Sequence, residues 1–320
     1  MKLRCTILDD YQNAALSMAD WSTILSQVDV HVVREHIADE DELAAALHQS
    51  DIIVAMRERT PFRKSLLSRL PDLKLLVTTG KRNASIDVAA AVEQGVTVCG
   101  TDGSSNATSE LTFALILGLA KNLLVENASL QNNGPWQTAI STDLSGSTLG
   151  ILGLGRIGSQ VARIGLAFGM DVVAWSQNLT GQQAASVGAR LAGSKEDLLR
   201  QSDFVSIHLV LSDRTRSLIG EKELSLMKSS AYLINTSRSA IVDQSALIHA
   251  LQNRRIAGAG LDVFDVEPLP QDDSFRSLPH VLATPHIGYV SKDTYRAWFP
   301  QVVENIQAYL LGSPIRQLTP

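Results

Sequence analysis

Short runs of β-branched and other apolar residues alternate along the chain with segments of helical periodicity. In the first hundred residues, strands are predicted for "LRCTIL", "VDVHVV", "DIIVAM", "LKLLVTT" and "VTVCG". Helices are predicted between them for "DEDELAAALHQ" and "PFRKSLLSRL", the second with Thr60 as its N-cap and Pro61 at its first position. This alternation predicts parallel strands with helices on both faces of the sheet.

The alternation restarts at about residue 147 with a second set of predicted strands, "TLGILGL", "DVVAW", "DFVSIHL", "AYLINT", "IAGAGLDV" and "HVLATP". A long apolar segment, "SELTFALILGLAKNLL", separates the two sets and is predicted to be a helix. The final amphipathic segment, "VSKDTYRAWFPQVVENIQAYLLG", is also predicted to be helical, with Gly312 placed as its C-cap. We therefore expect an α/β fold with two doubly wound parallel-sheet domains and a cleft between them.

A glycine-rich turn follows the first strand of the second set. Gly153, Gly155 and Gly158 form a G-x-G-x-x-G frame that opens a helical pattern. The first glycine permits a tight turn, the second lets the backbone approach a pyrophosphate, and the third allows close packing of helix and strand. A tight turn that binds nothing is the alternative. The context of strand, turn and helix favours a dinucleotide site that also includes Arg156 and Ile157.

The choice of dinucleotide depends on the end of the next strand. An NAD site usually carries Asp or Glu there, whereas "AWSQNLT" places Ser176 and Gln177 in that region. Without a carboxylate, a 2′-phosphate meets no repulsion, although no arginine follows directly to bind one. Arg190 or Lys195 would have to approach in the fold. The sequence favours NADP slightly and leaves NAD open.

Polar residues recur where the predicted strands of the second set end. His208, Arg238, Asp262 and His286 each follow such a strand, and ligands of open parallel sheets bind beyond the carboxyl ends. Each alone is explained by a solvated loop. Together, beside a nicotinamide, they suit reduction of a ketone: histidine supplies a proton near neutral pH, and arginine binds a carboxylate. Glu267, on the proline-bounded loop "DVFDVEPLP", is either the carboxylate that fixes the imidazole or a surface acid of a polar loop.

Composition and charge narrow the class of protein further. A net charge of −5 over 320 residues, with no long basic run, argues against nucleic acid as a partner. The two cysteines have no metal or redox spacing, so reduced thiols and no metal site are expected. The acidic start "MKLRCTILDDY" does not resemble a signal peptide, and no apolar run reaches membrane-spanning length. We expect a cytoplasmic protein with no membrane partner.

The motifs "NTSRSAIVDQSALIHAL", "AGAGLDVFDVEPLP" and "ATPHIG", together with the glycine turn, closely resemble the D-isomer-specific 2-hydroxyacid dehydrogenases, the family of phosphoglycerate dehydrogenases and glyoxylate and hydroxypyruvate reductases. The resemblance covers essentially the whole chain. It implies that Arg238 orients the substrate carboxylate, that His286 is the general acid/base, and that Glu267 tunes it. It also implies that Asp262 contacts the nicotinamide carboxamide, and that Thr236 and Ser237 line the cofactor pocket. His208, at its strand end, is expected in the same pocket.

The same resemblance implies a domain plan. Residues 1–101 and 288–320 would form a flavodoxin-like substrate domain, and residues 102–287 a Rossmann cofactor domain. The chain crossings near "CGTDGSS" and "HIGYVS" would be the hinges for closure. Substrate contacts from the first domain would come from Arg57, the backbone around Gly80, and Lys81. The family's usual homodimer, with the cofactor domain at the interface, is expected.

The chain departs from the family pattern and leaves some alternatives. Ser239 follows the arginine where the family has glycine. Lys81 and Arg82 would favour a second anionic group on the substrate, such as a phosphate, or are simply solvated. Corepressors of this fold retain the same Arg, Glu and His and sense dinucleotides, so an interaction protein is the alternative function. A formate-type dehydrogenase is disfavoured, because that group has glutamine in place of Glu267. The individual 2-oxo acid stays open.

Overall fold

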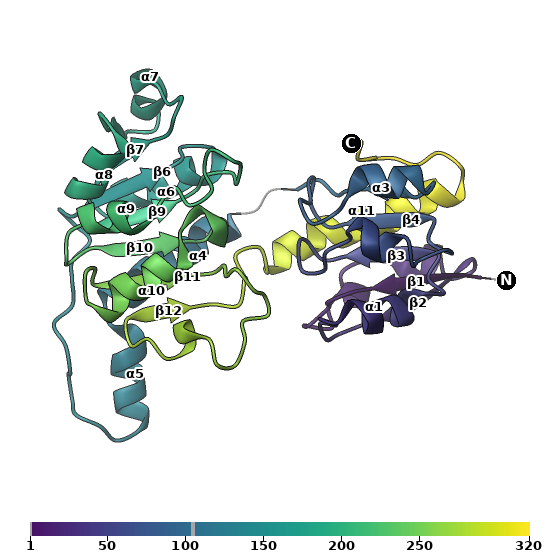
Figure 1. Ribbon diagram of the computed structural model, residues 1–320, viewed down its shortest axis with the longest axis horizontal. Helices are drawn as coiled ribbons and strands as arrows, with labels where there is room; N and C mark the ends of the chain where they lie inside the picture. Colours follow the sequence, from purple (N-terminus) through teal and green to yellow (C-terminus); the bar gives the residue numbers. More distant parts are fainter. Residues whose placement is uncertain (1, 104–105) are drawn as a thin grey trace. The chain divides into compact units, whose positions relative to one another are not determined.

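Two parallel β-sheets organise the chain, which confirms the predicted α/β fold class (Figure 1). The computed structural model describes residues 2–103 and 106–320. The chain divides into two compact units, Met1–Ser105 with Val290–Pro320, and Asn106–Tyr289. Two residues of the predicted hinge segment "CGTDGSS", Ser104 and Ser105, lie outside the described residues.

The first unit is built on a five-stranded sheet with the order β2-β1-β3-β4-β5. All neighbouring strands are parallel, with Cys5 paired to Ile52 and Ile53 to Leu76. The strands β3 and β4 are buried along their whole length, as their unbroken apolar runs require. The strands are β1 (Leu3–Ile7), β2 (Val28–Val32), β3 (Ile52–Ala55), β4 (Leu75–Thr78) and β5 (Thr97–Cys99).

Helices pack on this sheet, and the last helix of the chain, α11, packs against β4. Its end has Gly312 at φ 71°, the left-handed conformation expected of a C-terminal glycine. The helices of the first unit are α1 (Glu40–Leu47), α2 (Lys64–Leu67), α3 (Val88–Glu93), α11 (Lys292–Leu310), and the 3-10 turns η1 (Ala15–Ser17) and η2 (Trp21–Thr23).

The predicted start of the second helix is wrong. Thr60 does not cap a helix, because its hydroxyl donates to Asp9 Oδ2 at 2.6 Å, and α2 begins only after Arg63. Phe62 is held in an extended conformation by a bridge to Ile86, so the chain cannot yet coil. A contact between distant segments therefore overrides the local capping signal.

The second unit is built on a seven-stranded parallel sheet with the order β12-β11-β10-β9-β6-β7-β8. The strand order reverses between β6 and β9, which is where a ligand crevice is expected in such sheets. The strands are β6 (Thr148–Leu152), β7 (Asp171–Trp175), β8 (Arg190–Leu191), β9 (Phe204–Ile207), β10 (Tyr232–Asn235), β11 (Gly258–Leu261) and β12 (Val281–Ala283). The sequence patterns did not predict β8, which has only two residues.

The helices of the second unit are α4 (Ala107–Ala120), α5 (Leu123–Gln131), α6 (Arg156–Ala167), α7 (Gly181–Ala185), α8 (Lys195–Gln201), α9 (Glu221–Leu226) and α10 (Gln244–Gln252), with the 3-10 turns η3 (Ser239–Ile241) and η4 (Ser274–Arg276). The long predicted apolar helix is two helices, because Asn122 adopts a left-handed conformation (φ 51°) between α4 and α5. Figure 1 shows α5 and the following segment projecting away from the sheet of this unit.

In the described part of the chain, no single helix is long and apolar enough to cross a membrane. The helices α4 and α5 together have the length and apolar composition of a membrane span, but the chain bends by 63° between them.

Candidate active site

The glycine turn between β6 and α6 has the conformation that a dinucleotide site needs. Gly153 has φ 98°, and a Cβ atom there would lie 2.7 Å from the carbonyl oxygen of His208. A Cβ on Gly158 would lie 2.0 Å from the carbonyl oxygen of Gly153, so the helix packs on the turn only because both are glycine. Gly155 is the N-cap of α6, and a Cβ there would meet no atom within 4 Å. The open backbone at Gly155 therefore fits a pyrophosphate at the N-terminus of α6.

A hydrogen bond connects the segment after β9 to the loop that carries Arg238. His208 follows β9, and its Nε2 is hydrogen-bonded to Ser206 Oγ at 2.8 Å. Burial lowers the pKa of His208 to about 4, so its imidazole is neutral at physiological pH. Ser237 Oγ donates to the carbonyl oxygen of Leu209 at 2.5 Å. The strand ends that line the predicted cofactor site are therefore linked to each other.

The segment after β7 offers no charge for the adenosine end of a dinucleotide. Ser176 and Gln177 follow the strand directly, as predicted. The two cations considered for a 2′-phosphate have other partners: Arg190 binds Asp171 at 2.5 Å, and Lys195 binds Glu223 at 2.9 Å. Asp171 is the first residue of β7, so its ion pair lies at the amino end of the strand, whereas Ser176 follows its carboxyl end. Arg190 is thus held at the amino end of β7, and Lys195 is held by Glu223.

The loop after β10 presents Arg238. Asn235 fixes this loop, since its Oδ1 accepts from Ser237 N at 3.0 Å and its Nδ2 donates to the carbonyl oxygen of Arg238 at 3.0 Å. The Arg238 guanidinium also donates to the carbonyl oxygen of Ser237 at 2.8 Å. Ser239 begins η3 without a positive φ, so a serine in place of the family's glycine imposes no backbone strain.

Thr236, another residue of this loop predicted to line the cofactor pocket, is buried. Its hydroxyl lies 3.0 Å from that of Thr112 on α4. Its side chain therefore ties the loop to the helix beneath it.

Glu267 and His286, two of the three predicted catalytic groups, are in direct contact. His286 Nδ1 lies 2.6 Å from Glu267 Oε2. An ionised carboxylate only accepts hydrogen bonds, so Nδ1 carries the proton, and Nε2 is left to exchange one with a ligand. The Tyr289 ring packs on the imidazole in a T-shaped arrangement, with ring centroids 5.5 Å apart. This arrangement suits proton transfer from Nε2.

Asp262, predicted to contact a nicotinamide, lies at the end of β11 and is 1% exposed. Its oxygens accept hydrogen bonds from Thr284 Oγ1, Ile287 N and Gly288 N. Burial raises the pKa of Asp262, and these donors oppose that rise because they favour the ionised form. The sequence did not indicate the contact with Thr284, although the threonine is visible in "ATPHIG".

The predicted substrate residues of the first unit follow β3 and β4. Arg57 has φ 55°, stacks on Trp298 with its guanidinium carbon 5.9 Å from the ring centroid, and pairs with Glu58 at 3.3 Å. The Gly80 N–H donates to Thr101 Oγ1 at 2.7 Å. The exposed Lys81 lies 3.5 Å from Asp102. Each of these groups thus has a partner inside its own unit.

Comparison with known proteins gives consistent results. Residues 113–288 match the family described as D-isomer specific 2-hydroxyacid dehydrogenase, NAD binding domain. The chain is 41% identical over 257 residues to a glyoxylate reductase of Aeropyrum pernix, a match that covers 77% of this chain and 76% of that protein.

It is 34% identical over 276 residues to a D-3-phosphoglycerate dehydrogenase of Methanocaldococcus jannaschii, covering 85% of this chain and 52% of that protein. The chain therefore spans about half the length of that relative. A crystal structure of a phosphoglycerate oxidoreductase from Vibrio cholerae o395 superposes with a TM-score of 0.92 at 36% identity, over 97% of this chain and 100% of that one.

Proposed function

This chain belongs to the D-isomer specific 2-hydroxyacid dehydrogenase family, and on that premise we propose that it reduces small 2-oxo acids to D-2-hydroxy acids with His286 as the proton donor. As a member of the family it is an NAD(P)-dependent oxidoreductase acting on a CH–OH group. The observation that carries the proposed role of His286 is the 2.6 Å contact of its Nδ1 with Glu267, which leaves Nε2 for the substrate.

The residues of the second unit fit a nicotinamide dinucleotide. The turn of Gly153, Gly155 and Gly158, with Arg156 and Ile157 in the first turn of α6, would hold the pyrophosphate. Ser176 and Gln177 after β7 would face the adenosine ribose. His208, Thr236 and Ser237 would line the remaining pocket. When bound, the reduced nicotinamide supplies the hydride.

The chain's own residues would complete the reduction. The Arg238 guanidinium would bind the substrate carboxylate through paired N–H donors and polarise the adjacent carbonyl. His286 Nε2 would give its proton to the carbonyl oxygen as the hydride reaches the carbon, so the ketone becomes an alcohol. Glu267 would stabilise the imidazolium before transfer and fix its orientation. In the reverse direction His286 would take the proton back.

The preference between the two cofactors is proposed to be small. The end of β7 carries no carboxylate to repel a 2′-phosphate, which favours NADPH slightly. The ion pairs of Arg190 with Asp171 and of Lys195 with Glu223 remove the two cations that would strengthen that preference. We therefore expect both NADH and NADPH to support turnover.

Glyoxylate and hydroxypyruvate are the proposed substrate class. Relatives of this chain include glyoxylate reductases and a hydroxypyruvate reductase from Thermotoga maritima, 32% identical over 289 residues. A substrate with a second anionic group, such as 3-phosphohydroxypyruvate, would need cations from the first unit. There, Arg57 and Lys81 are each paired with an acid, and Lys81 is exposed, so we rank this substrate lower.

A second copy of the chain is the proposed partner. The helix α5 has no buried residue, and large apolar side chains that are half exposed or more gather on it and the following segment: Leu123, Leu124, Val125, Leu130, Trp136 and Ile140. Exposed apolar surface of this kind marks a protein contact. We propose that α5 and residues 132–141 pack on a second copy to form a homodimer.

Hydrogen bonds hold this exposed segment in one conformation. The Glu126 carboxylate accepts from the backbone N–H groups of Thr138 and Ala139 and from the Thr138 hydroxyl. These bonds tie the segment that bears Trp136 and Ile140 to α5. A surface ordered in advance loses less conformational entropy when it associates, which favours its use as an interface.

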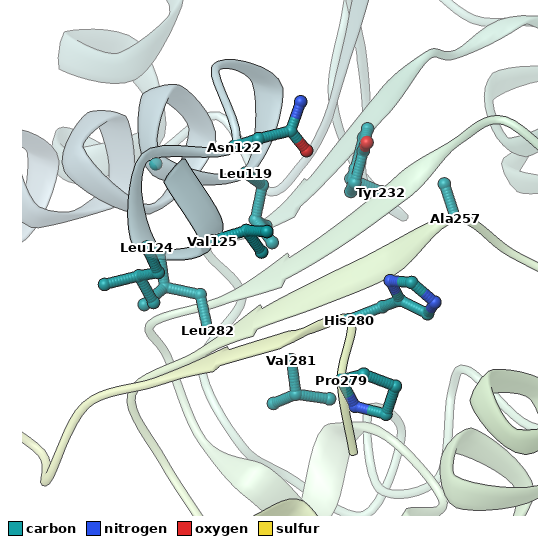
Figure 2. A pocket seen from close by; sticks show the side chains of 11 residues that line it. Leu119, Asn122, Leu124, Val125, Tyr232, Ala257, Pro279, His280, Val281 and Leu282 are labelled. Atoms are coloured by element: carbon teal, nitrogen blue, oxygen red, sulfur yellow. The ribbon is translucent and has the colours of Figure 1, made fainter. Parts of the chain in front are cut away.

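A pocket beside α5 supports the same proposal. Figure 2 shows Leu124 and Val125 of α5 among the residues around it, together with His280, Val281 and Leu282 at the start of β12. The pocket lies at the amino ends of β10–β12, away from the proposed active site at their carboxyl ends. The Nε2 atom of His280 is buried and has no hydrogen-bond partner among the described residues.

The test is an assay of the purified protein with NADH or NADPH and a panel of 2-oxo acids, following loss of reduced-cofactor absorbance. Turnover of glyoxylate or hydroxypyruvate is expected, with a loss on the order of 10²- to 10⁴-fold in His286→Ala. The matched control is His249→Ala, an exposed histidine on α10, which should turn over normally. Tight cofactor binding with no turnover of any acid would instead favour a dinucleotide-sensing interaction protein.

A further inference from the structure

The turn that carries His286 has a conformation that needs support from elsewhere. His286 has φ 50°, the left-handed region, which a residue with a Cβ adopts only against steric strain. Its N–H donates to the carbonyl oxygen of Thr284 at 2.9 Å, which makes the turn very tight. The contact with Glu267 holds the imidazole but not this backbone. Another group must therefore hold the main chain on both sides of His286.

Asp262 is that group. Its Oδ1 accepts from Thr284 Oγ1 at 2.6 Å, two residues before His286, and from Ile287 N at 2.8 Å, one residue after it. Its Oδ2 accepts from Gly288 N at 2.8 Å. One buried carboxylate thus binds three donors that bracket the histidine.

The backbone of Asp262 is itself held by the sheet. Asp262 N donates to the carbonyl oxygen of Asn235 at 3.0 Å, which continues the pairing of β10 and β11. A Cβ on Gly288 would lie 2.8 Å from Asp262 Oδ2, so only glycine lets the backbone approach the carboxylate this closely. Thr108 Oγ1 on α4 donates to the carbonyl oxygen of Gly288 at 2.8 Å and gives the turn a further support.

We propose that Asp262 is a positioning residue for catalysis, holding the backbone of residues 284–288 so that His286 Nε2 is correctly aimed. This inference rests on the proposed function and extends it. Two carboxylates that follow β11 hold different parts of this turn: Glu267 binds the imidazole of His286, and Asp262 binds the main chain around it. Displacing a reacting group by about 1 Å costs on the order of 10²-fold in rate, so the hold on the main chain affects turnover directly.

The role inferred from family resemblance, a contact of Asp262 with the nicotinamide carboxamide, makes a different prediction. A carboxylate offers about four lone-pair sites, and three donors of the turn already use most of them. A carboxamide contact would strengthen cofactor binding. A positioning role acts on the chemical step and leaves cofactor affinity unchanged. Measuring kcat and the cofactor Kd therefore distinguishes the two roles: loss of a positioning residue lowers kcat, and loss of a carboxamide contact raises the Kd.

The first experiment compares Asp262→Asn with wild type. The amide nitrogen of asparagine is a donor and cannot accept the hydrogen bonds of the turn. The two sets of donors would repel each other, and the turn would shift. We expect kcat at saturating cofactor to fall about 10- to 100-fold, with the Kd of NADH and NADPH within about twofold of wild type. Asp265→Asn, the same change at an exposed position three residues along, is the control and should behave as wild type. A rise in cofactor Kd of about tenfold with kcat unchanged would overturn the proposal.

A second pair of variants covers the case that Asp262→Asn does not fold. Thr284→Val removes one donor to Asp262, and Thr284→Ser keeps it. Thr284→Val should lower kcat several-fold at unchanged cofactor Kd, and Thr284→Ser should restore most of it. Equal turnover of Thr284→Val and wild type would contradict the proposal.

A readout without turnover keeps this proposal separate from the proposed function. Histidine-ring ¹⁵N NMR of the wild type should show His286 with its proton on Nδ1, bound to Glu267. Asp262→Asn should weaken that signature, and Asp265→Asn should not. Absence of turnover in wild type, with the signature still dependent on Asp262, would refute the enzymatic function alone. A signature unchanged in Asp262→Asn would refute the positioning role alone.

Discussion

His286 Nδ1 donates to Glu267 Oε2 across 2.6 Å, joining a loop that follows β11 to one that follows β12. The two residues are 19 positions apart in the sequence, and the parallel pairing of β11 with β12 brings their loops together. Because the carboxylate holds Nδ1–H, the tautomer is fixed with Nε2 facing away from the glutamate. This pair is the basis of the proton transfer proposed above.

Glu267→Gln should lower kcat/KM about 10- to 100-fold while leaving cofactor Kd unchanged. The amide keeps an acceptor for Nδ1–H but carries no charge to stabilise the imidazolium that would give its proton to the substrate. The measurement is steady-state kcat/KM for glyoxylate reduction, together with the cofactor Kd. A kcat/KM equal to that of wild type would contradict the role given to Glu267.

Arg238→Lys should raise the KM for the 2-oxo acid at least about tenfold and also lower kcat. Lysine keeps the charge but lacks the planar pair of donors that binds a carboxylate and polarises the carbonyl. Steady-state kinetics at saturating cofactor measure both constants. An unchanged KM would show that the substrate carboxylate binds elsewhere.

Ser176→Asp should shift cofactor use toward NADH. A carboxylate at the end of β7 would bind ribose hydroxyls and repel a 2′-phosphate, so the ratio of kcat/KM for NADPH to that for NADH should fall about tenfold or more. Gln182→Asp on the exposed start of α7 adds the same charge away from the strand end and is the control. Equal ratios in the two variants would argue that Ser176 does not face the ribose.

His208 should make the fold less stable as the pH falls from 6.5 toward 4. Burial lowers its pKa from 6.5 to about 4, so in this window the unfolded state binds a proton that the folded state excludes. The contribution of His208 to the free energy of unfolding is fully present above pH 6.5. It falls by up to about 3 kcal/mol as the pH is lowered to 4.

His208→Gln should flatten that pH dependence, measured by urea unfolding at about pH 7 and about pH 5. The exposed His249→Gln should not. Parallel losses of stability in wild type and His208→Gln would contradict the prediction.

Leu124→Glu should dissociate the proposed dimer. The side chain is 55% exposed on α5, so the substitution removes apolar contact area without disturbing the core of the unit. Sedimentation should shift toward the monomer, whereas Leu16→Glu, at a similarly exposed leucine of the first unit, should sediment as wild type. A wild-type protein that sediments as a monomer would refute the dimer itself.

Most of the architecture could be predicted because its causes are local. The short apolar runs "DIIVAM" and "LKLLVTT", with their β-branched residues, predict buried strands, and the glycine spacing in "LGLGRIG" predicts the turn before α6. The two-residue strand β8 carries no such signal. The break at Asn122 was also not predicted, because it interrupts an apolar pattern that continues on both sides.

The fold class, the glycine turn and the chemical groups at the strand ends all follow from the amino-acid sequence alone, because parallel strands bring their carboxyl ends to one edge of a sheet. The partner of each group depends instead on tertiary packing. Thr60 binds Asp9 instead of capping a helix, and Arg190 binds Asp171 instead of facing the cofactor site. Asp262 binds the turn that carries His286. Such partners are distant in sequence and are brought together only by the packing of the elements that carry them.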